Sequence, residues 1–415
     1  MLDHDKKNRV YGLLITIIWP FWGLIYSIKN RYREFSVDIF FVVCIYLGFI
    51  HIFNPIGGSG ADGLVYATKL GVVYNSHVTF SEFFRLFSQD EGAFDIYQPL
   101  LTFIVSLFTN DAHYLFVCFA VVFGYFYSKN IWYVINRISP DSDIYIFIFI
   151  VFYILICPVS NINGVRMWTA LHVFVYGLLP YLYENDTRKL YWMPLSLLFH
   201  FSFVLPLGIF IAYNFLPKRL SFFFIFYLIT LFVKEVDLAL VRLILHNYLP
   251  DIFFNRVESY TSEEYAQNIN SVEYSWHVYL AKNISYWIVQ IFIVISYFVM
   301  RLRNDDDSRL NALFGFSLFI YGISNVLSYI PSAHRYIVIS QMFMIPFFIF
   351  CIDRYGDSAL IRKGKYFLLL LLFSIVFNIR SMLDYYGVSL VFGNFFTAFF
   401  YDDRIPIIDF VKKVF

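Results

Sequence analysis

Long apolar stretches, separated by short basic loops, cover most of this chain. A helix of about 17–25 apolar residues spans a hydrocarbon core about 30 Å thick. Only 15% of the 415 residues are charged, against about a quarter in soluble domains. We therefore expect an all-α polytopic transmembrane bundle of about 11–13 membrane segments, with residues 1–415 forming a single integral membrane domain. The alternating segments of about ten residues that a transmembrane barrel requires are absent from the sequence.

Basic residues predict the orientation of the bundle, because loops rich in Lys and Arg stay on the cytoplasmic side. They gather near the N-terminus and in the loops 29–35, 129–137, 184–189, 214–219, 301–309 and 354–365. The outer side then carries two long loops, 54–96 and 234–280, the second with an amphipathic stretch at 236–249. This pattern indicates an outward-facing site with an interfacial helix over its mouth.

Two apolar segments near the N-terminal half do not fit simple crossings. Segment 10–28 has basic residues on both sides and Trp19-Pro20 in its middle. Because Pro interrupts a helix and Trp favours the membrane interface, we expect a re-entrant or in-plane hairpin there. Segment 97–109 is too short for a full crossing and is better suited to a half-crossing.

A short polar break, Asn161-Ile162-Asn163-Gly164-Val165-Arg166, separates two apolar helices on the expected outer side. Arg at membrane depth costs about 2.5–3.5 kcal/mol on insertion scales, so Arg166 should face a partner or a water-filled cavity. Its planar fork of donors fits phosphate, and the turn before it exposes backbone N–H groups at a helix start. We predict that Arg166 and Asn163 bind a lipid-linked diphosphate. The alternative is an Arg that only reaches a lipid headgroup.

His200 stands alone in the apolar segment 190–213, which lies between basic loops and has a Pro on either side of the His. The simplest interpretation is two half-helices that meet at a polar tip, where the backbone lines protein or water. Imidazole titrates near neutral pH, so His200 is a candidate general base or diphosphate donor. The alternative is a packed His that donates to a neighbouring carbonyl.

The sequence Ser332-Ala333-His334-Arg335-Tyr336 repeats the logic of the first polar break, with an Arg at the start of an outer helix. Two Arg side chains from separate helices that converge on one cavity would suit a doubly charged phosphate ligand. We therefore predict that His334, Arg335 and Tyr336 contribute to substrate binding.

Asp62 and Tyr66 follow a glycine-rich turn with helical spacing, so one helix face should carry both. Asp62 is a candidate base for an acceptor hydroxyl, and Tyr66 is a candidate residue for substrate binding. The alternative for Asp62 is a carboxylate that caps the helix 62–70. A second acidic group, Asp305-Asp306-Asp307, lies in an expected inner loop and is interpreted as a solvated charge cluster.

Several common chemistries have no motif in this chain. It contains no H-E-x-x-H, G-x-G-x-x-G or P-loop pattern, which leaves zinc, dinucleotide and ATP chemistry without support. The net charge of +1 gives no support for nucleic acid binding. We expect no cofactor and no metal.

The polar motifs together resemble a known family. The pieces NINGVRMWTALHVFVYGLLPYLYE and YWMPLSLLFHFSFVLPLGIF, joined by a short basic turn, look like the EpsG/Wzy-type exopolysaccharide and O-antigen polymerases. Asp62 with Tyr66, and His334-Arg335-Tyr336, are similar to other recurrent positions of that family. The strong match covers about 160–210, and Met167 departs from the Gln that often follows the Arg.

The resemblance implies a GT-C-like glycosyltransferase on the outer face of a bacterial inner membrane. Such an enzyme would transfer a growing glycan from polyprenyl (undecaprenyl) diphosphate to the terminal sugar of a new lipid-linked repeat unit. Arg166 and Arg335 would neutralise the departing diphosphate. His200 would assist the leaving group or the acceptor, with Asp62 as the alternative base. Membrane lipids and a chain-length regulator protein are further expected partners.

Three other functions compete with polymerisation. A lipid-linked oligosaccharide flippase also needs cations for a diphosphate, but it predicts pseudo-symmetric halves, and no internal repeat is visible. A membrane O-acyltransferase would need its His-Arg chemistry on a face that the acyl donor reaches. A GT-C enzyme that uses a polyprenyl-phosphate sugar is normally marked by paired acids in the first outer loop, where Asp62 has no adjacent acid.

Overall fold

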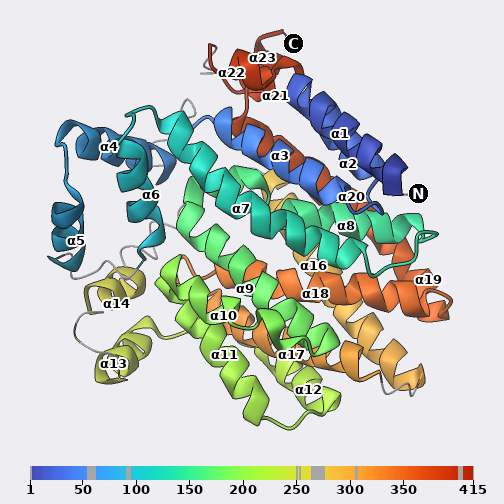
Figure 1. Cartoon of the computed structure of the whole chain (residues 1–415). Helices are drawn as coiled ribbons and strands as arrows, with labels where there is room; N and C mark the ends of the chain where they lie inside the picture. Colours follow the sequence, from blue (N-terminus) through green and yellow to red (C-terminus); the bar gives the residue numbers. More distant parts are fainter. Residues whose placement is uncertain are drawn as a thin grey trace.

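The computed structural model describes residues 2–53, 62–89, 95–248, 251, 254–262, 276–303, 307–400 and 405–414. Across these ranges the chain is helical and contains no strand (Figure 1). Six helical stretches in the described residues are long and apolar enough to cross a membrane, and several shorter apolar helices accompany them. The expected all-α polytopic bundle is confirmed.

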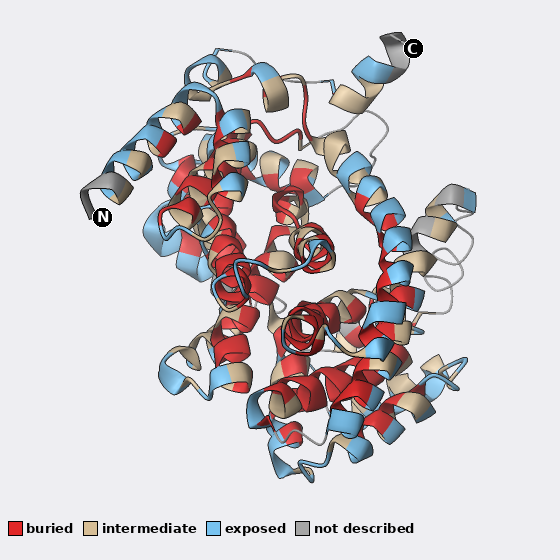
Figure 2. Ribbon diagram, turned by 90° about the vertical axis from the view of Figure 1, so that its right-hand side faces the viewer, coloured by how far each residue is buried: buried red, intermediate tan, exposed pale blue. Residues whose placement is uncertain are grey.

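Long helices form the centre of the bundle. They are α7 (Ala112–Ile135), α8 (Ile144–Ile156), α9 (Val165–Glu184), α16 (Trp276–Arg303), α17 (Ser308–Leu327), α18 (Arg335–Tyr355) and α20 (Leu368–Met382). Shorter helices α3 (Ser36–Phe49), α6 (Tyr97–Ser106), α11 (Val204–Phe215) and α12 (Leu220–Thr230) pack around them. Buried residues concentrate along the inner helices (Figure 2). Stacked rings such as Phe314 on Phe347, with centroids 4.0 Å apart, join α17 to α18.

The N-terminal segment folds as the hairpin that its Pro predicts. Helices α1 (Leu2–Ile18) and α2 (Pro20–Lys29) meet at Trp19. They pack antiparallel through glycines, since a Cβ on Gly23 would lie 2.3 Å from Oγ1 of Thr16. The indole of Trp19 donates to the carbonyl of Val391 (2.6 Å), which ties this turn to the C-terminal region.

The segment that carries His200 also folds as predicted. After α9 the chain runs back along that helix through α10 (Trp192–Leu195) and η3 (Ser196–Leu198). Close contact between Gly177 and the Met193 backbone holds the two runs together. The chain breaks at His200, which is extended (φ −154°, ψ 117°), and continues through η4 (Phe201–Phe203) into α11. This antiparallel return brings the tip level with the start of α9.

A layer of short helices gathers at one end of the long ones (Figure 1). It consists of α4 (Asp62–Asn75), α5 (Phe80–Gln89), α13 (Leu238–Tyr248) and α14 (Phe254–Thr261). Helix α13 lies within the stretch 236–249, where the sequence predicts an amphipathic interfacial helix. Other parts of the expected outer loops 54–96 and 234–280 lie outside the described residues.

The opposite end of the bundle is held by ion pairs between helix ends. Arg137, just after the end of α7, donates from Nε to Glu184 of α9 (2.8 Å). Asp307 pairs with Arg354 and caps α17, and its side chain is only 5% exposed. The expectation of a solvated acidic cluster is therefore wrong for Asp307, because capping and pairing bury its carboxylate. Asp305 and Asp306 lie outside the described residues.

Candidate active site

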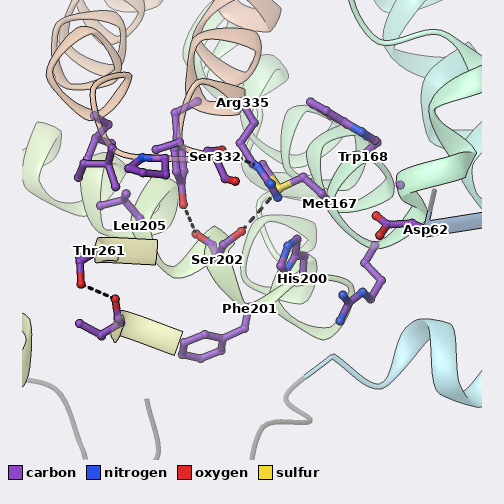
Figure 3. A pocket seen from close by; sticks show the side chains of 18 of the residues that line it. Asp62, Met167, Trp168, His200, Phe201, Ser202, Leu205, Thr261, Ser332 and Arg335 are labelled. Carbon is purple, nitrogen blue, oxygen red and sulfur yellow. Dashed lines mark hydrogen bonds between the residues drawn. The ribbon is translucent and has the colours of Figure 1, made fainter. Parts of the chain in front are cut away.

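A cavity of about 850 Å³ opens at the end of the bundle where α4, α13 and α14 lie. Its size falls within the range of about 300–1,000 Å³ that is common for small-molecule sites. One wall is polar or charged and is lined by Asp62, Tyr66, Arg166, His200, Ser202, Arg335 and Tyr336 (Figure 3). Apolar residues, called the apolar wall below, also line the cavity and include Leu205, Val241, Leu245, Val257, Leu327 and Ile330.

A buried carboxylate, Asp95, organises the polar wall from beneath. Its side chain is 2% exposed and lies just before α6. Oδ1 accepts from the backbone N–H of Phe201 (2.6 Å), and Oδ2 lies 3.3 Å from Nη1 of Arg166. Nδ1 of His200 lies 3.2 Å from the same Oδ2, at ion-pair distance but with an angle outside that of a well-formed hydrogen bond.

These contacts determine the ionisation of Asp95. Burial alone would raise the pKa of its carboxyl group. The contacts with His200 and the Phe201 N–H, together with the charge of Arg166, outweigh that effect and hold the pKa below its ordinary value. A charged Asp95 therefore holds Arg166 and His200 side by side on the cavity wall.

His200 is positioned by the break in the chain that it occupies. Its backbone N–H donates to the carbonyl of Ser196 (3.0 Å), which ends the first half-helix. The ring lines the cavity with its side chain 14% exposed, and the buried ring nitrogen is Nδ1. Because Nδ1 faces Asp95, Nε2 is the nitrogen available to a ligand in the cavity.

Asp62 and Tyr66 share a face of α4, as their spacing predicts, and both line the cavity. Asp62 is exposed in the first turn of the helix, whereas Tyr66 is 4% exposed. Burial and the nearby Asp62 raise the pKa of Tyr66 to about 12, although Arg166 acts in the opposite direction. The phenol of Tyr66 is thus protonated at neutral pH and can donate.

Arg335 begins α18 on another side of the cavity. Its Nε donates to the carbonyl of Ser332 (2.7 Å), a residue in the left-handed conformation (φ 63°). Within the described part of the chain no carboxylate pairs with this guanidinium. The hydroxyl of Tyr336 donates to the carbonyl of Ser202 (3.3 Å), which links α18 to the tip that carries His200.

Two residues predicted to bind substrate lie away from the cavity lining. Oδ1 of Asn163 accepts from the N–H of Gly63 (3.1 Å), so Asn163 positions the start of α4. His334 is exposed and immediately precedes α18, and it is not among the residues that line the cavity. The structure thus brings together six of the eight predicted residues: Asp62, Tyr66, Arg166, His200, Arg335 and Tyr336.

Sequence reasoning missed Asp95. It is preceded by a more conspicuous acidic pair, Asp90-Glu91, in the same expected loop. The available signal was its position directly before an apolar segment too short to cross a membrane, where a carboxylate needs a partner. The described residues contain no group of three or more His, Cys, Asp or Glu side chains that could hold a metal ion.

The bundle and its cavity define a multi-pass membrane protein with a cavity that is lined by two arginines and by apolar side chains. Residues 38–392 match the EpsG family, and the chain belongs to that family. Membership associates it in general terms with membrane-bound synthesis of polysaccharides. No curated protein and no solved structure matches the chain.

Proposed function

We propose that the protein is a polymerase of lipid-linked polysaccharide repeat units. It would transfer a glycan from polyprenyl diphosphate to the terminal sugar of another lipid-linked repeat unit. The observation that carries this proposal is the shared carboxylate Asp95, which holds Arg166 and His200 together at the cavity surface. A cation and a titratable base at one wall are the groups that transfer from a diphosphate leaving group requires.

The arginines would act on the leaving group. When the bond between the anomeric carbon and the diphosphate oxygen breaks, its electron pair stays with the diphosphate. Arg166 has a side chain 41% exposed, and Arg335 has no carboxylate partner in the described residues, so both can turn donors toward an anion. Such preorganised donors stabilise charge that develops in the transition state. Tyr66 would add a neutral donor beside them.

The acceptor hydroxyl must lose a proton as its oxygen bonds to the anomeric carbon. His200 is suited to take it, because Asp95 holds Nδ1 and leaves Nε2 toward the cavity. The exposed Asp62, across the polar wall on α4, is the alternative base. No step of this reaction uses a metal or a cofactor.

The apolar wall would receive the lipid part of the substrates. Val241 and Leu245 of α13, with Val257 of α14, line the same cavity as the charged residues. On the other side of α13, Leu240 and Leu243 are exposed and suit a membrane interface. Since basic residues gather at the opposite end of the bundle, we propose a bacterial inner-membrane location with the cavity facing the periplasm.

The test is the glycan that cells make with single variants His200→Gln, Arg166→Gln and Arg335→Gln. We expect each to remove the ladder of polymer lengths on a gel while single repeat units still appear on the outer face. Arg188→Gln is the matched control, because Arg188 is an exposed arginine paired with Asp186 outside the cavity.

Two outcomes would contradict the proposal. If well-expressed variants of all these cavity residues kept the full ladder, the polymerase site would lie elsewhere. If single repeat units failed to reach the outer face, the protein would be a flippase. Purified protein with lipid-linked repeat units then provides the direct assay of transfer.

A further inference from the structure

Away from the cavity, two lysines lie close together among aromatic rings. Lys129 is near the end of α7, and Lys189 ends η2 (Thr187–Lys189), the turn that follows α9. Nζ of Lys189 lies 4.4 Å from the ring centroid of Tyr176, and Nζ of Lys129 lies 6.0 Å from that of Tyr125. We define the lysine patch as Tyr125, Lys129, Tyr176, Lys189 and Trp192.

The acidic residues near the lysine patch pair with arginines and not with the patch lysines. Glu184 and Asp186, the acidic residues next to Lys189 in sequence, are each bound by an arginine through paired hydrogen bonds, from Arg137 and Arg188 respectively. Neither patch lysine forms an ion pair with a described residue. Burial lowers the pKa of Lys189 against the opposing effect of Asp186, and Lys129 is among the cations that lower it further.

The aromatic rings hold the lysines in place. Tyr176 packs between Tyr125 and Trp192, with ring centroids 6.3 Å and 6.1 Å away. The turn that carries Lys189 sits tightly on α9, because a Cβ on Gly177 would lie 3.1 Å from the Lys189 carbonyl oxygen. Two half-buried cations held side by side, neither of them in an ion pair with a described residue, provide a prepared site for an external anion.

We infer that the lysine patch binds the phosphate headgroup of an anionic phospholipid. Val121, one turn before Tyr125 on α7, and Tyr191, whose ring centroid lies 5.3 Å from that of Trp192, are exposed hydrophobic side chains beside the patch. A ligand with both a phosphate and acyl chains therefore matches the patch and the apolar surface beside it. Basic pockets between transmembrane helices on the cytoplasmic side are known to bind such headgroups.

The experiment measures lipid binding by the full-length protein. Purified protein is titrated with phosphatidylglycerol in nanodiscs of otherwise phosphatidylcholine composition, and retained lipid is measured by native mass spectrometry. Each lysine near a surface contributes about 1 kcal/mol, so Lys129→Gln and Lys189→Gln should each weaken binding about fivefold, and the double variant about 25-fold.

Lys218→Gln is the matched control. Lys218 also lies over a tyrosine, with Nζ 3.4 Å from the Tyr213 ring centroid. It lies outside the lysine patch, and its ammonium group donates to the Tyr213 carbonyl. This variant should retain wild-type binding of phosphatidylglycerol. An equal loss in Lys218→Gln would mean general surface attraction and would overturn the proposal.

Two further arms identify the ligand. Inorganic phosphate at the same concentration should not displace the lipid, and displacement would indicate a free-phosphate site instead. Phosphatidylglycerol binding that the double variant leaves unchanged would also overturn the inference. The experiment measures lipid retention and not glycan transfer. A negative result would therefore overturn the lipid-binding inference without bearing on the proposed polymerase activity.

Discussion

The two ends of this helical bundle use charge in different ways. At the end away from the cavity, Glu184 is paired with Arg137, and Asp307 with Arg354, so that each carboxylate joins two helices. At the cavity end, the single carboxylate of Asp95 serves Arg166, His200 and a backbone N–H at once.

This difference separates structural from functional charge. Ion pairs that are complete within the protein stabilise the helix ends, and their charged groups have few donors or acceptors left for a ligand. A shared carboxylate leaves its cations only partly satisfied, and such cations can bind an added anion. Perturbations at the two ends should therefore differ in their main effect, which is lost stability at the far end and lost activity at the cavity end.

The largest effect is expected from Asp95→Asn. The amide keeps an acceptor for the Phe201 N–H but removes the negative charge that holds Arg166 and His200. Polymer formation should fall by about 10²–10³, the usual cost of removing one preorganised electrostatic contact. The measurement is the glycan ladder, normalised to the amount of folded protein in size-exclusion chromatography. A full ladder at equal folded protein would show that Asp95 does not organise the site.

A paired comparison comes next, between Arg166→Gln and Arg137→Gln. Arg166→Gln should remove polymer with little change in the thermal unfolding midpoint. Arg137→Gln should lower the unfolding midpoint, because the variant loses the ion pair with Glu184. It also loses the contact of the guanidinium with Tyr133, where Cζ of Arg137 lies 3.5 Å from the ring centroid. Because this ion pair is partly exposed, its loss should lower the free energy of unfolding by only about 1 kcal/mol. Polymer per folded molecule should stay at the wild-type level in Arg137→Gln, and a drop there would break the comparison.

Gly63→Ala tests how α4 is positioned. A Cβ at Gly63 would lie 2.3 Å from Oδ1 of Asn163, so either the Asn163 side chain or the start of α4 must shift, and the hydrogen bond between them is lost. We expect a fall in activity of about tenfold, because a displacement of about 1 Å at a site costs up to 10²-fold. Asn163→Ala removes the clash partner, so the double variant should recover part of the activity. No recovery in the double variant would mean that Asn163 acts on substrate directly.

Much of the fold follows from local sequence rules. Pro20 and the flanking charges predicted the α1–α2 hairpin, and the isolated His200 between prolines predicted the broken segment. These features are local, so hydrophobic length and helix-breaking residues suffice. The ion pairs at the far end could not be predicted, because Arg137 and Glu184 come together only when α7 packs on α9.

The site was predictable in part for the same reason. Arg166 and Arg335 were conspicuous as charged groups at helix starts, and His200 as an isolated polar group within an apolar segment. Asp95 was not, since its role depends on contacts with α9 and with the tip, which are distant in sequence. Asn163 shows the reverse error: it belongs to the right motif, but its side chain serves Gly63 rather than the cavity.

Acid should affect the cavity end through Asp95. Its pKa in the folded protein is below its ordinary value of about 3.8, so the unfolded chain binds a proton more readily. The carboxylate therefore adds stability above about pH 4, and this contribution is lost as the pH falls through the folded-state pKa. Thermal unfolding between pH 7 and pH 3 should show a smaller acid-induced fall in Asp95→Asn than in wild type. Parallel curves would exclude this linkage.

The smallest effect is expected from Tyr336→Phe. This change removes only the hydroxyl that donates to the Ser202 carbonyl (3.3 Å), a neutral contact between α18 and the tip. Such hydrogen bonds contribute about 0.5–1.5 kcal/mol, so the unfolding midpoint should fall slightly. If the contact only positions the tip, activity should fall by less than about tenfold, with the pH profile of transfer unchanged. A loss as large as that of Asp95→Asn would instead mean that the Tyr336 hydroxyl contacts the substrate and belongs with the partly satisfied groups of the cavity end.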